Sequence, residues 1–154
     1  MGAKTWMIIY SDDQPSNIFE RYPNPDLEKT ISLLNRLFPN EKLEKTDDGD
    51  LSFTCPSNEM IFAGHFDGIS VVAAKEFGID NPSKIDRRFI SESPFKKAYI
   101  HAMHSVVDWF AFAKWEDGEL TRSLSLSPDS GIIEDFGEKF EFELPYWKGA
   151  HPAI

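Results

Sequence analysis

The sequence predicts an α+β fold, in which a mostly antiparallel sheet of about six to eight strands carries two main helices. Asp-Gly pairs, which join neighbouring antiparallel strands through two-residue loops, provide the first reason. The other reasons are an apolar strand-like run and two Asn-Pro pairs that open helix-like segments. These features lie at residues 48–49, 67–68 and 117–118 (Asp-Gly), 5–10 (apolar run), and 24–25 and 81–82 (Asn-Pro).

The first strand is expected at residues 5–10, where both alternating faces are apolar. A strand of this kind is covered on both sides, so we place it inside the sheet. Residues 98–104 and 132–135 are expected to form two more strands. Residues 43–53 predict a further hairpin around Asp48-Gly49, with mixed apolar and polar faces.

The longer helix is expected to begin with Asn24 as N-cap and Pro25 in its first turn, and to end at Pro39. Its apolar stripe is expected at Leu27, Ile31, Leu34 and Phe38. The shorter helix is expected to begin in the same way at Asn81 and Pro82, and to bury Ile85 and Phe89.

A two-residue loop also fixes which residues face each other across a hairpin. Around Asp67-Gly68, His65 is expected opposite Ser70 and Ala63 opposite Val72. Around Asp117-Gly118, Trp115 is expected opposite Leu120 and Arg122 opposite Ala113. This register places the Arg122 guanidinium on the same face as the indoles of Trp109 and Trp115.

The composition limits the classes of partner. The length of 154 residues suits one domain, residues 1–154, and the sequence holds 16 basic and 26 acidic residues for a net charge of −10. Such a charge disfavours nucleic acid and favours a basic protein as partner. No apolar run is long enough to cross a membrane. The single cysteine, Cys55, and the lack of a signal-like N-terminus predict a cytoplasmic protein without disulfides.

The densest group of possible metal ligands is His101, His104 and Asp108. In a helix these three side chains would share one face and could bind a transition metal. The β-branched and aromatic neighbours instead favour a strand, on which His101 and His104 point to opposite faces. We therefore expect neither a metal site nor a cofactor here.

Arg122 has two interpretations. A guanidinium among apolar side chains needs a carboxylate or an anion. It is either a structural arginine paired with an acidic residue, or it recognises an anionic ligand in a pocket formed with Trp109 and Trp115. The second interpretation predicts an enclosed apolar cavity with one charged end.

Several segments together resemble a family of short bacterial proteins catalogued as a domain of unknown function. They are Met1-Gly-Ala-Lys-Thr-Trp6, His101-Ala-Met-His-Ser-Val-Val-Asp-Trp109, Trp115-Glu-Asp-Gly118, Arg122-Ser-Leu-Ser-Leu-Ser-Pro-Asp129 and Pro145-Tyr-Trp-Lys-Gly-Ala-His-Pro152. The resemblance implies a bacterial, cytosolic, stand-alone domain. It implies no activity, cofactor or catalytic residue.

These observations predict a non-catalytic binding module, immunity-like or regulatory, that uses an acidic and aromatic surface to engage a protein partner. Tyr146 and Trp147 in the C-terminal segment are candidate partner-binding residues. The first alternative is a small hydrolase or ligand-processing enzyme that uses His65, His101, His104 and Asp108, with Arg122 as a further group. The second alternative is a small-molecule binder with the Trp109, Trp115 and Arg122 pocket. A monomer or a small homo-oligomer fits all three.

Overall fold

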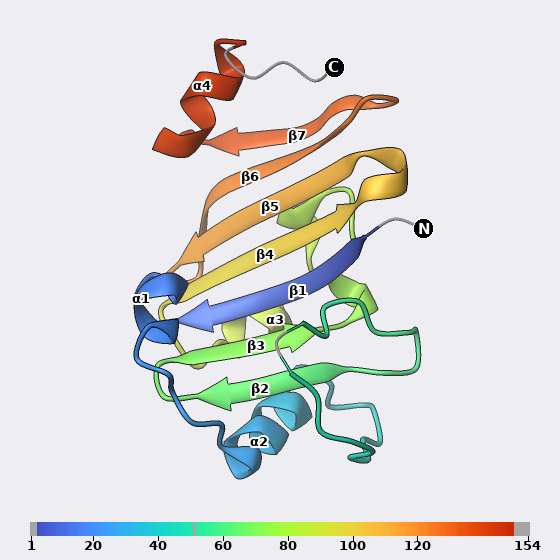
Figure 1. Cartoon of the computed structure of the whole chain (residues 1–154), viewed down its shortest axis with the longest axis vertical. Helices are drawn as coiled ribbons and strands as arrows, with labels where there is room; N and C mark the ends of the chain where they lie inside the picture. Colours follow the sequence, from blue (N-terminus) through green and yellow to red (C-terminus); the bar gives the residue numbers. More distant parts are fainter. Residues whose placement is uncertain (1–2, 51, 150–154) are drawn as a thin grey trace.

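The computed structural model describes residues 3–50 and 52–149, and it contains a seven-stranded antiparallel sheet with short helices around it (Figure 1). The strands lie in the order β2-β3-β1-β4-β5-β6-β7. The predicted α+β class and antiparallel sheet are therefore confirmed. The strands are β1 Lys4–Ser11, β2 Phe62–Phe66, β3 Ile69–Ala73, β4 Lys97–His104, β5 Trp109–Glu116, β6 Glu119–Ser127 and β7 Gly131–Gly137.

The connections contain short helices, and α2 is the longest in the described residues. No helix in this part of the chain is long and apolar enough to cross a membrane. The α-helices are α1 Pro15–Phe19, α2 Leu27–Leu37, α3 Arg88–Ser91 and α4 Leu144–Trp147, and the 3-10 helices are η1 Lys75–Phe77, η2 Pro82–Lys84, η3 Ser105–Val107 and η4 Glu141–Glu143.

The hydrophobic core lies on one face of the sheet, which we call the covered face. There Ile8, Ile100 and Ala113 of three neighbouring strands belong to the same cluster as Leu33 and Leu37 of α2, and each is at most 1% exposed. In Figure 1, α3 lies behind the strands, so the viewer looks at the opposite, open face. No helix crosses the front of β1, β4 and β5 in that view.

The strands expected at residues 5–10, 98–104 and 132–135 correspond to β1, β4 and β7, and β1 has neighbours on both sides as predicted. The β2–β3 hairpin has the predicted register, with His65 opposite Ser70 and Ala63 opposite Val72. Gly68 in its turn has a φ of +84°, the positive value that the Asp-Gly loop requires.

The hairpin predicted around Asp48-Gly49 is wrong, because residues 43–50 form no strand. Leu43 and Phe53, which were to lie in its two strands, are 40% and 45% exposed. A strand pair needs one buried face to offset the entropy of ordering, and this segment does not provide one.

The β5–β6 hairpin begins in the predicted register and then shifts by one residue. Trp115 faces Leu120 as expected, but Lys114 faces Arg122, so Thr121 is an extra residue on β6. Thr121 Oγ1 donates a hydrogen bond to the Lys114 carbonyl at 3.1 Å. A one-residue bulge reverses the face of every later side chain. The predicted pairing of Arg122 with Ala113 is wrong for this reason, and Arg122 points to the open-face side.

Helix α2 begins later than predicted, at Leu27 with Asp26 as its N-cap. The Asp26 carboxylate accepts from the Lys29 N–H at 3.0 Å, whereas Pro25 is held in a β-bridge with Phe66. This bridge keeps residue 25 extended, which excludes it from the helix. The buried stripe also differs from the predicted one. Of the predicted stripe, Leu27 and Ile31 are exposed, Leu34 is half-buried against the core, and Phe38 is buried as predicted. The buried side chains within α2 itself are Thr30, Leu33 and Leu37.

The second predicted helix is interrupted. Residues 82–84 and 88–91 form η2 and α3, and Ile85 between them has an extended ψ of 144°. The Asp86 carboxylate accepts from the Arg88 N–H at 3.0 Å, which starts the second turn separately. Phe89 is buried as predicted.

Candidate functional site

Arg122 is completely buried and bound on several sides by the protein itself. Its Nε and Nη2 donate to the two carboxylate oxygens of Glu143 at 3.0 and 2.6 Å, and its Nη1 donates to Asp135 at 2.6 Å. Nη1 also lies 3.2 and 2.9 Å from the carbonyl oxygens of Ser123 and Phe136. Two carboxylates already neutralise the guanidinium, so the geometry favours the structural interpretation over anion recognition.

Glu143 is the main partner of Arg122 and is only 3% exposed. It also accepts from the Phe140 N–H at 2.7 Å and from Trp147 Nε1 at 3.3 Å. Burial acts to raise the pKa of Glu143, but hydrogen bonds, first among them that from Arg122, lower the pKa below its usual value. The hydrogen bond with Glu143 in turn raises the pKa of Arg122. This charged pair attaches η4 and α4 to β6.

The predicted pocket of Trp109, Trp115 and Arg122 does not form. Both indoles lie on the covered side of β5, whereas the guanidinium lies on the open side of β6. Each indole lines a different cavity, at opposite ends of β5, and Arg122 lines neither. The bulge at Thr121 places Arg122 on the face opposite the two indoles, and the length of β5 separates the indoles from each other.

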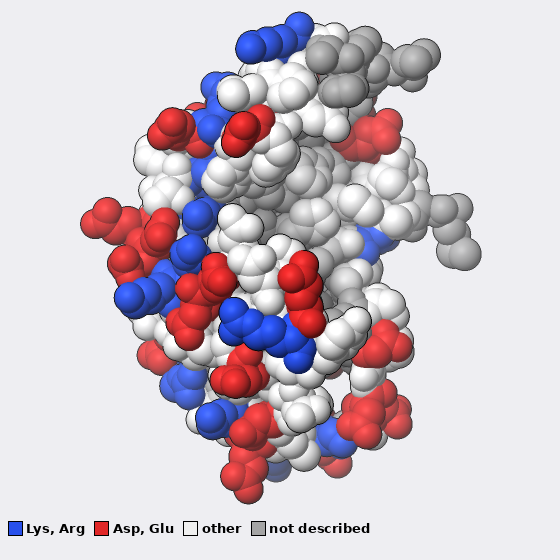
Figure 2. All heavy atoms as spheres, turned by 60° about the vertical axis from the view of Figure 1, so that its left-hand side comes forward, with Lys and Arg blue, Asp and Glu red and all other residues white. Residues whose placement is uncertain are grey.

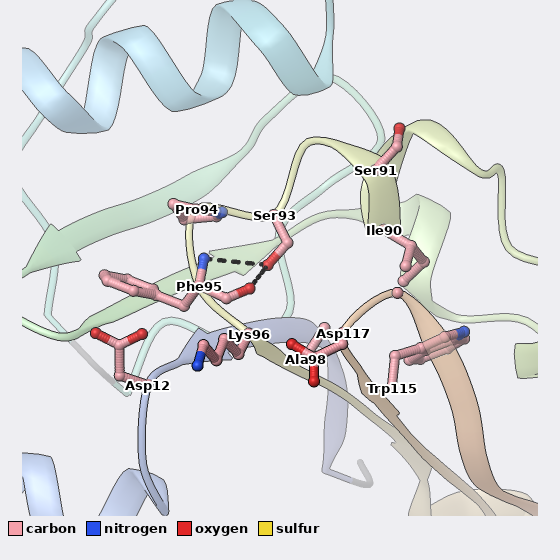
Figure 3. Close-up of a pocket in the computed structure, with 11 residues that line it drawn as sticks. Asp12, Ile90, Ser91, Ser93, Pro94, Phe95, Lys96, Ala98, Trp115 and Asp117 are labelled. Atoms are coloured by element: carbon pink, nitrogen blue, oxygen red, sulfur yellow. Dashed lines mark hydrogen bonds between the residues drawn. The ribbon is translucent and has the colours of Figure 1, made fainter.

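The first cavity has a volume of about 530 Å³ and is lined by Trp115, α3, residues 93–96 and the β5–β6 turn (Figure 3). Ser93 Oγ donates to the Phe95 carbonyl at 2.6 Å and accepts from the Phe95 N–H at 3.3 Å, as in a local turn. The Lys96 side chain extends toward Asp12 rather than toward Ser93 (Figure 3). The hydroxyl therefore has no base beside it, and this cavity offers no activated nucleophile.

The second cavity has a volume of about 360 Å³ and lies where β4 ends and β5 begins. Its lining includes Trp6, His104 and Trp109, together with the carboxylates Asp80 and Asp129. Sequence analysis did not connect these five residues, because they come from β1, the η1–η2 connection, β4, β5 and the β6–β7 turn.

His101 and His104 lie on one strand, β4, as predicted, and so they point to opposite faces. Asp108 follows η3 in a left-handed conformation with a φ of 50°. The three side chains predicted as possible metal ligands do not converge. Within residues 3–50 and 52–149, no group of three His, Cys, Asp or Glu side chains could hold a metal ion.

His65 is bound to its cross-strand neighbour. Its Nδ1 lies 2.6 Å from Ser70 Oγ, and its ring stacks on Phe95 with centroids 5.6 Å apart. Burial is the main cause that lowers the pKa of His65. Ser70 is completely buried, so its hydroxyl is not accessible to a substrate. No histidine in the described residues forms an ion pair with a carboxylate. The enzymatic alternative gains no support from this geometry.

His101 lies in the middle of the open face, between Met7 of β1 and Phe112 of β5. Its ring contacts Phe110 edge to face, with centroids 5.6 Å apart. Nδ1 is buried without a hydrogen-bond partner, and burial lowers the pKa of His101. An unpaired polar atom of this kind destabilises the isolated chain.

The side chains around His101 form a broad apolar surface. Two phenylalanines continue it beyond the strands. The ring centroid of Phe112 in β5 lies 5.8 Å from that of Phe140 and 6.0 Å from that of Phe142. Phe142 is 64% exposed. We call this surface the aromatic open face, and its half-buried or exposed members are Met7, Ile9, Tyr99, His101, Met103, Phe110, Phe112, Leu126, Phe140 and Phe142.

Charged side chains do not form a comparable surface on the side of the molecule at the left of Figure 1. Figure 2 shows lysine, arginine, aspartate and glutamate interspersed there, without a patch of one sign. Lys114 lies 3.7 Å from Glu116, and Lys139 lies 3.9 Å from Asp135. This side of the molecule therefore offers no ionic binding surface to compare with the aromatic open face.

Tyr146 and Trp147, the predicted partner-binding residues, lie in the short helix α4, beyond strand β7 (Figure 1). They are 63% and 39% exposed. Lys139 Nζ lies 4.5 Å from the centre of the Trp147 ring, and Glu143 accepts the indole N–H. The remaining residues of the C-terminal segment, 150–154, lie outside the described part of the chain.

Sequence analysis missed three structural carboxylates, Glu134, Asp135 and Glu143. Glu134 accepts hydrogen bonds from Ser123 Oγ, from the Ser83 N–H and hydroxyl at 3.0 and 2.6 Å, and from Asn81 Nδ2 at 3.3 Å. It thereby joins β7 to η2. A buried arginine signals that a carboxylate is near, but no spacing in the sequence selects which of the acidic C-terminal residues it is.

In the comparison with protein families, the model of a family of unknown function matches residues 5–154. The chain belongs to DUF6928, a family of unknown function. The match agrees with the resemblance that the sequence segments indicated, and it assigns no activity. No curated protein and no solved structure matches the chain.

Proposed function

We propose that this chain is a non-catalytic binding module that docks a basic protein partner on its aromatic open face. The observation that carries the proposal is the aromatic open face itself, a largely apolar surface over β1, β4, β5 and β6 that no helix crosses in Figure 1. Large exposed apolar surfaces on folded proteins are characteristic of sites where another macromolecule binds.

The shape and chemistry of this face suit a protein rather than a small molecule. It is a broad sheet surface, whereas small ligands bind in concave pockets. Its composition matches the buried centre of protein interfaces, where phenylalanine, tyrosine and methionine are enriched.

The net charge favours a basic partner over a second copy of the chain. Two copies, each with a net charge of −10, repel each other during approach. A basic partner is attracted instead, which accelerates association. The interspersed surface charges do not prevent this attraction, because the force between the chain and a distant basic partner depends on the net charge of each.

The buried polar groups also support a non-catalytic role. Arg122 is bound to Glu143 and Asp135, and Ser70 is completely buried beside His65. Groups that are held by other protein atoms in this way stabilise the fold, and they are not positioned to bind or activate a substrate.

The proposal can be tested with a matched pair of variants. Phe142→Ser removes an aromatic side chain from the open face, and Val106→Ser in η3 removes an apolar side chain elsewhere; both residues are 64% exposed. Immobilised wild-type chain first captures a partner, which is then purified and titrated against each variant by calorimetry at low and moderate salt.

We expect Phe142→Ser to weaken binding by about tenfold or more, Val106→Ser to leave it unchanged, and added salt to reduce the affinity of the wild-type chain. Equal binding by both variants would overturn the proposal, as would a partner without a basic surface. A stable dimer in light scattering that Phe142→Ser dissociates would assign the face to a second copy and also overturn it.

A further inference from the structure

The cavity of about 360 Å³ at the end of β4 has a chemistry that the proposed function does not use. We call it the indole cleft and define it by Trp6, Asp80, His104, Trp109 and Asp129. Its volume lies within the range of small-molecule sites, which is about 300–1,000 Å³. It opens on the covered side of the sheet, away from the aromatic open face.

Three aromatic rings form the wall of the cleft. The ring centroids of Trp6 and Trp109 are 6.3 Å apart with planes tilted by 43°, and the His104 ring meets Trp6 edge to face at 6.3 Å. The Trp109 Nε1 donates to Ser125 Oγ at 3.1 Å, so the polar edge of this indole is already bound within the protein. A ligand in the cleft can therefore contact the ring of this indole but gains no hydrogen-bond donor from it.

The backbone is adapted to the position of Trp6. A Cβ atom at Gly78 would lie 2.7 Å from Trp6 Cε3, a distance that real Cβ atoms do not tolerate. Only glycine at this position allows the chain to pack directly on the indole. Trp6 is thus held in place by its surroundings, as a preorganised binding surface requires.

Two carboxylates give the cleft its charge. Asp80 and Asp129 line it, both are exposed, and neither forms a hydrogen bond through its carboxylate or an ion pair with another described residue. No lysine or arginine is among the lining residues. The cleft therefore combines uncompensated negative charge with aromatic faces, and both attract cations.

The spacing of these groups selects the kind of cation. Asp80, Asp129 and His104 all line the cleft, yet within the described residues no three such side chains are close enough to hold one metal ion. A small ion cannot reach all of them at once. A larger cation with an apolar surface can contact the indoles while its charge lies between the carboxylates.

We propose that the indole cleft binds an organic ammonium ion alkylated at nitrogen. The alkyl groups pack against Trp6 and Trp109, where the ring quadrupoles stabilise the positive charge. Asp80 and Asp129 add an electrostatic contribution that a neutral ligand of the same shape does not receive. The same headgroup occurs in free choline-like molecules and in methylated lysine side chains.

The test compares choline with its neutral analogue of the same shape, 3,3-dimethylbutan-1-ol, by titration of the full chain with detection of indole fluorescence and heat. We expect choline to bind at least about tenfold more tightly than the alcohol. Equal affinity would show an apolar cleft without cation recognition and overturn the proposal, and so would no binding of choline at millimolar concentration.

Variants locate the site. Asp129→Asn should weaken choline by about threefold to fivefold, whereas Asp12→Asn, in the other cavity, should not change it. Trp6→Leu should weaken choline by about tenfold, and circular dichroism establishes that it is folded. Because Asp129 is exposed and makes no hydrogen bond through its carboxylate, Asp129→Asn is informative even when Trp6→Leu does not fold. Unchanged binding in Asp129→Asn would overturn the proposal.

A peptide with a trimethyllysine, compared with the same peptide carrying unmodified lysine, identifies the source of the ligand. Tighter binding of the methylated peptide than of choline assigns the cleft to a protein side chain. Tighter binding of choline assigns it to a free small molecule. Both results support recognition of the alkylated ammonium group.

Discussion

Replacement of Arg122 by methionine tests how the C-terminal segment is held to the sheet. Met keeps the apolar stem of the arginine and removes the guanidinium, which makes five hydrogen bonds. Glu143, only 3% exposed, then keeps two donors, the Phe140 N–H and Trp147 Nε1, but no cation. A buried carboxylate without a countercharge is left in the folded state.

The loss of one partner from a buried ion pair costs about 3–5 kcal/mol, most of it from the uncompensated charge. Arg122 is 0% exposed and Glu143 is 3% exposed, so solvent does not screen this pair. We expect Arg122→Met to lower the free energy of unfolding by that amount. Adding Glu143→Gln should restore part of the loss, because a neutral amide is less costly to bury than a carboxylate.

Urea unfolding monitored by circular dichroism measures this change, and Arg36→Met is the control. Arg36 and Glu92 form an ion pair at 3.6 Å, but their side chains are 42% and 44% exposed. Exposed pairs contribute at most about 1 kcal/mol, so this variant should stay close to wild type. A loss below about 1 kcal/mol for Arg122→Met would refute the structural role of the arginine.

Two further predictions concern a glycine and a histidine. Gly137 has a φ of +85°, and a Cβ there would lie 2.0 Å from the Thr121 carbonyl oxygen, whereas Gly131 has a φ of +67° with open space around it. In urea unfolding, Gly137→Ala should therefore lower the free energy of unfolding by about 1–3 kcal/mol more than Gly131→Ala does. Equal losses in the two variants would contradict the clash. His101→Phe should raise stability by about 1 kcal/mol at neutral pH, because it removes the unpaired Nδ1. The pKa of His101 is lowered in the folded state, so the unfolded chain binds the proton first as the pH falls below about 6.5. The free energy of unfolding of the wild-type chain should therefore fall through that pH range, and that of His101→Phe should fall less. Identical pH curves for the two proteins would count against the burial of this imidazole.

The strands and two of the hairpins could be predicted because their signals are local. Asp-Gly pairs at residues 67–68 and 117–118 set the turns, and the apolar run at residues 5–10 indicates an inner strand. The third Asp-Gly pair, at residues 48–49, forms no hairpin, which shows that the turn signal also needs strands with a face to bury.

The candidate sites were less predictable, because they depend on contacts between distant segments. The β-bridge between Pro25 and Phe66 holds residue 25 outside the helix, so that α2 begins at Leu27. The bulge at Thr121 moved Arg122 away from Trp109 and Trp115. Neither feature has a local sequence signal strong enough to indicate it.

By itself, the sequence determined the α+β class, the acidic character and the strand positions, because side-chain periodicity and turn chemistry act over a few residues. The tertiary structure decided which faces those strands present, how Arg122 meets Glu143, and which residues form the aromatic open face and the indole cleft. A shift of one residue reverses a whole strand face, and only the packing of the complete sheet selects between the two registers.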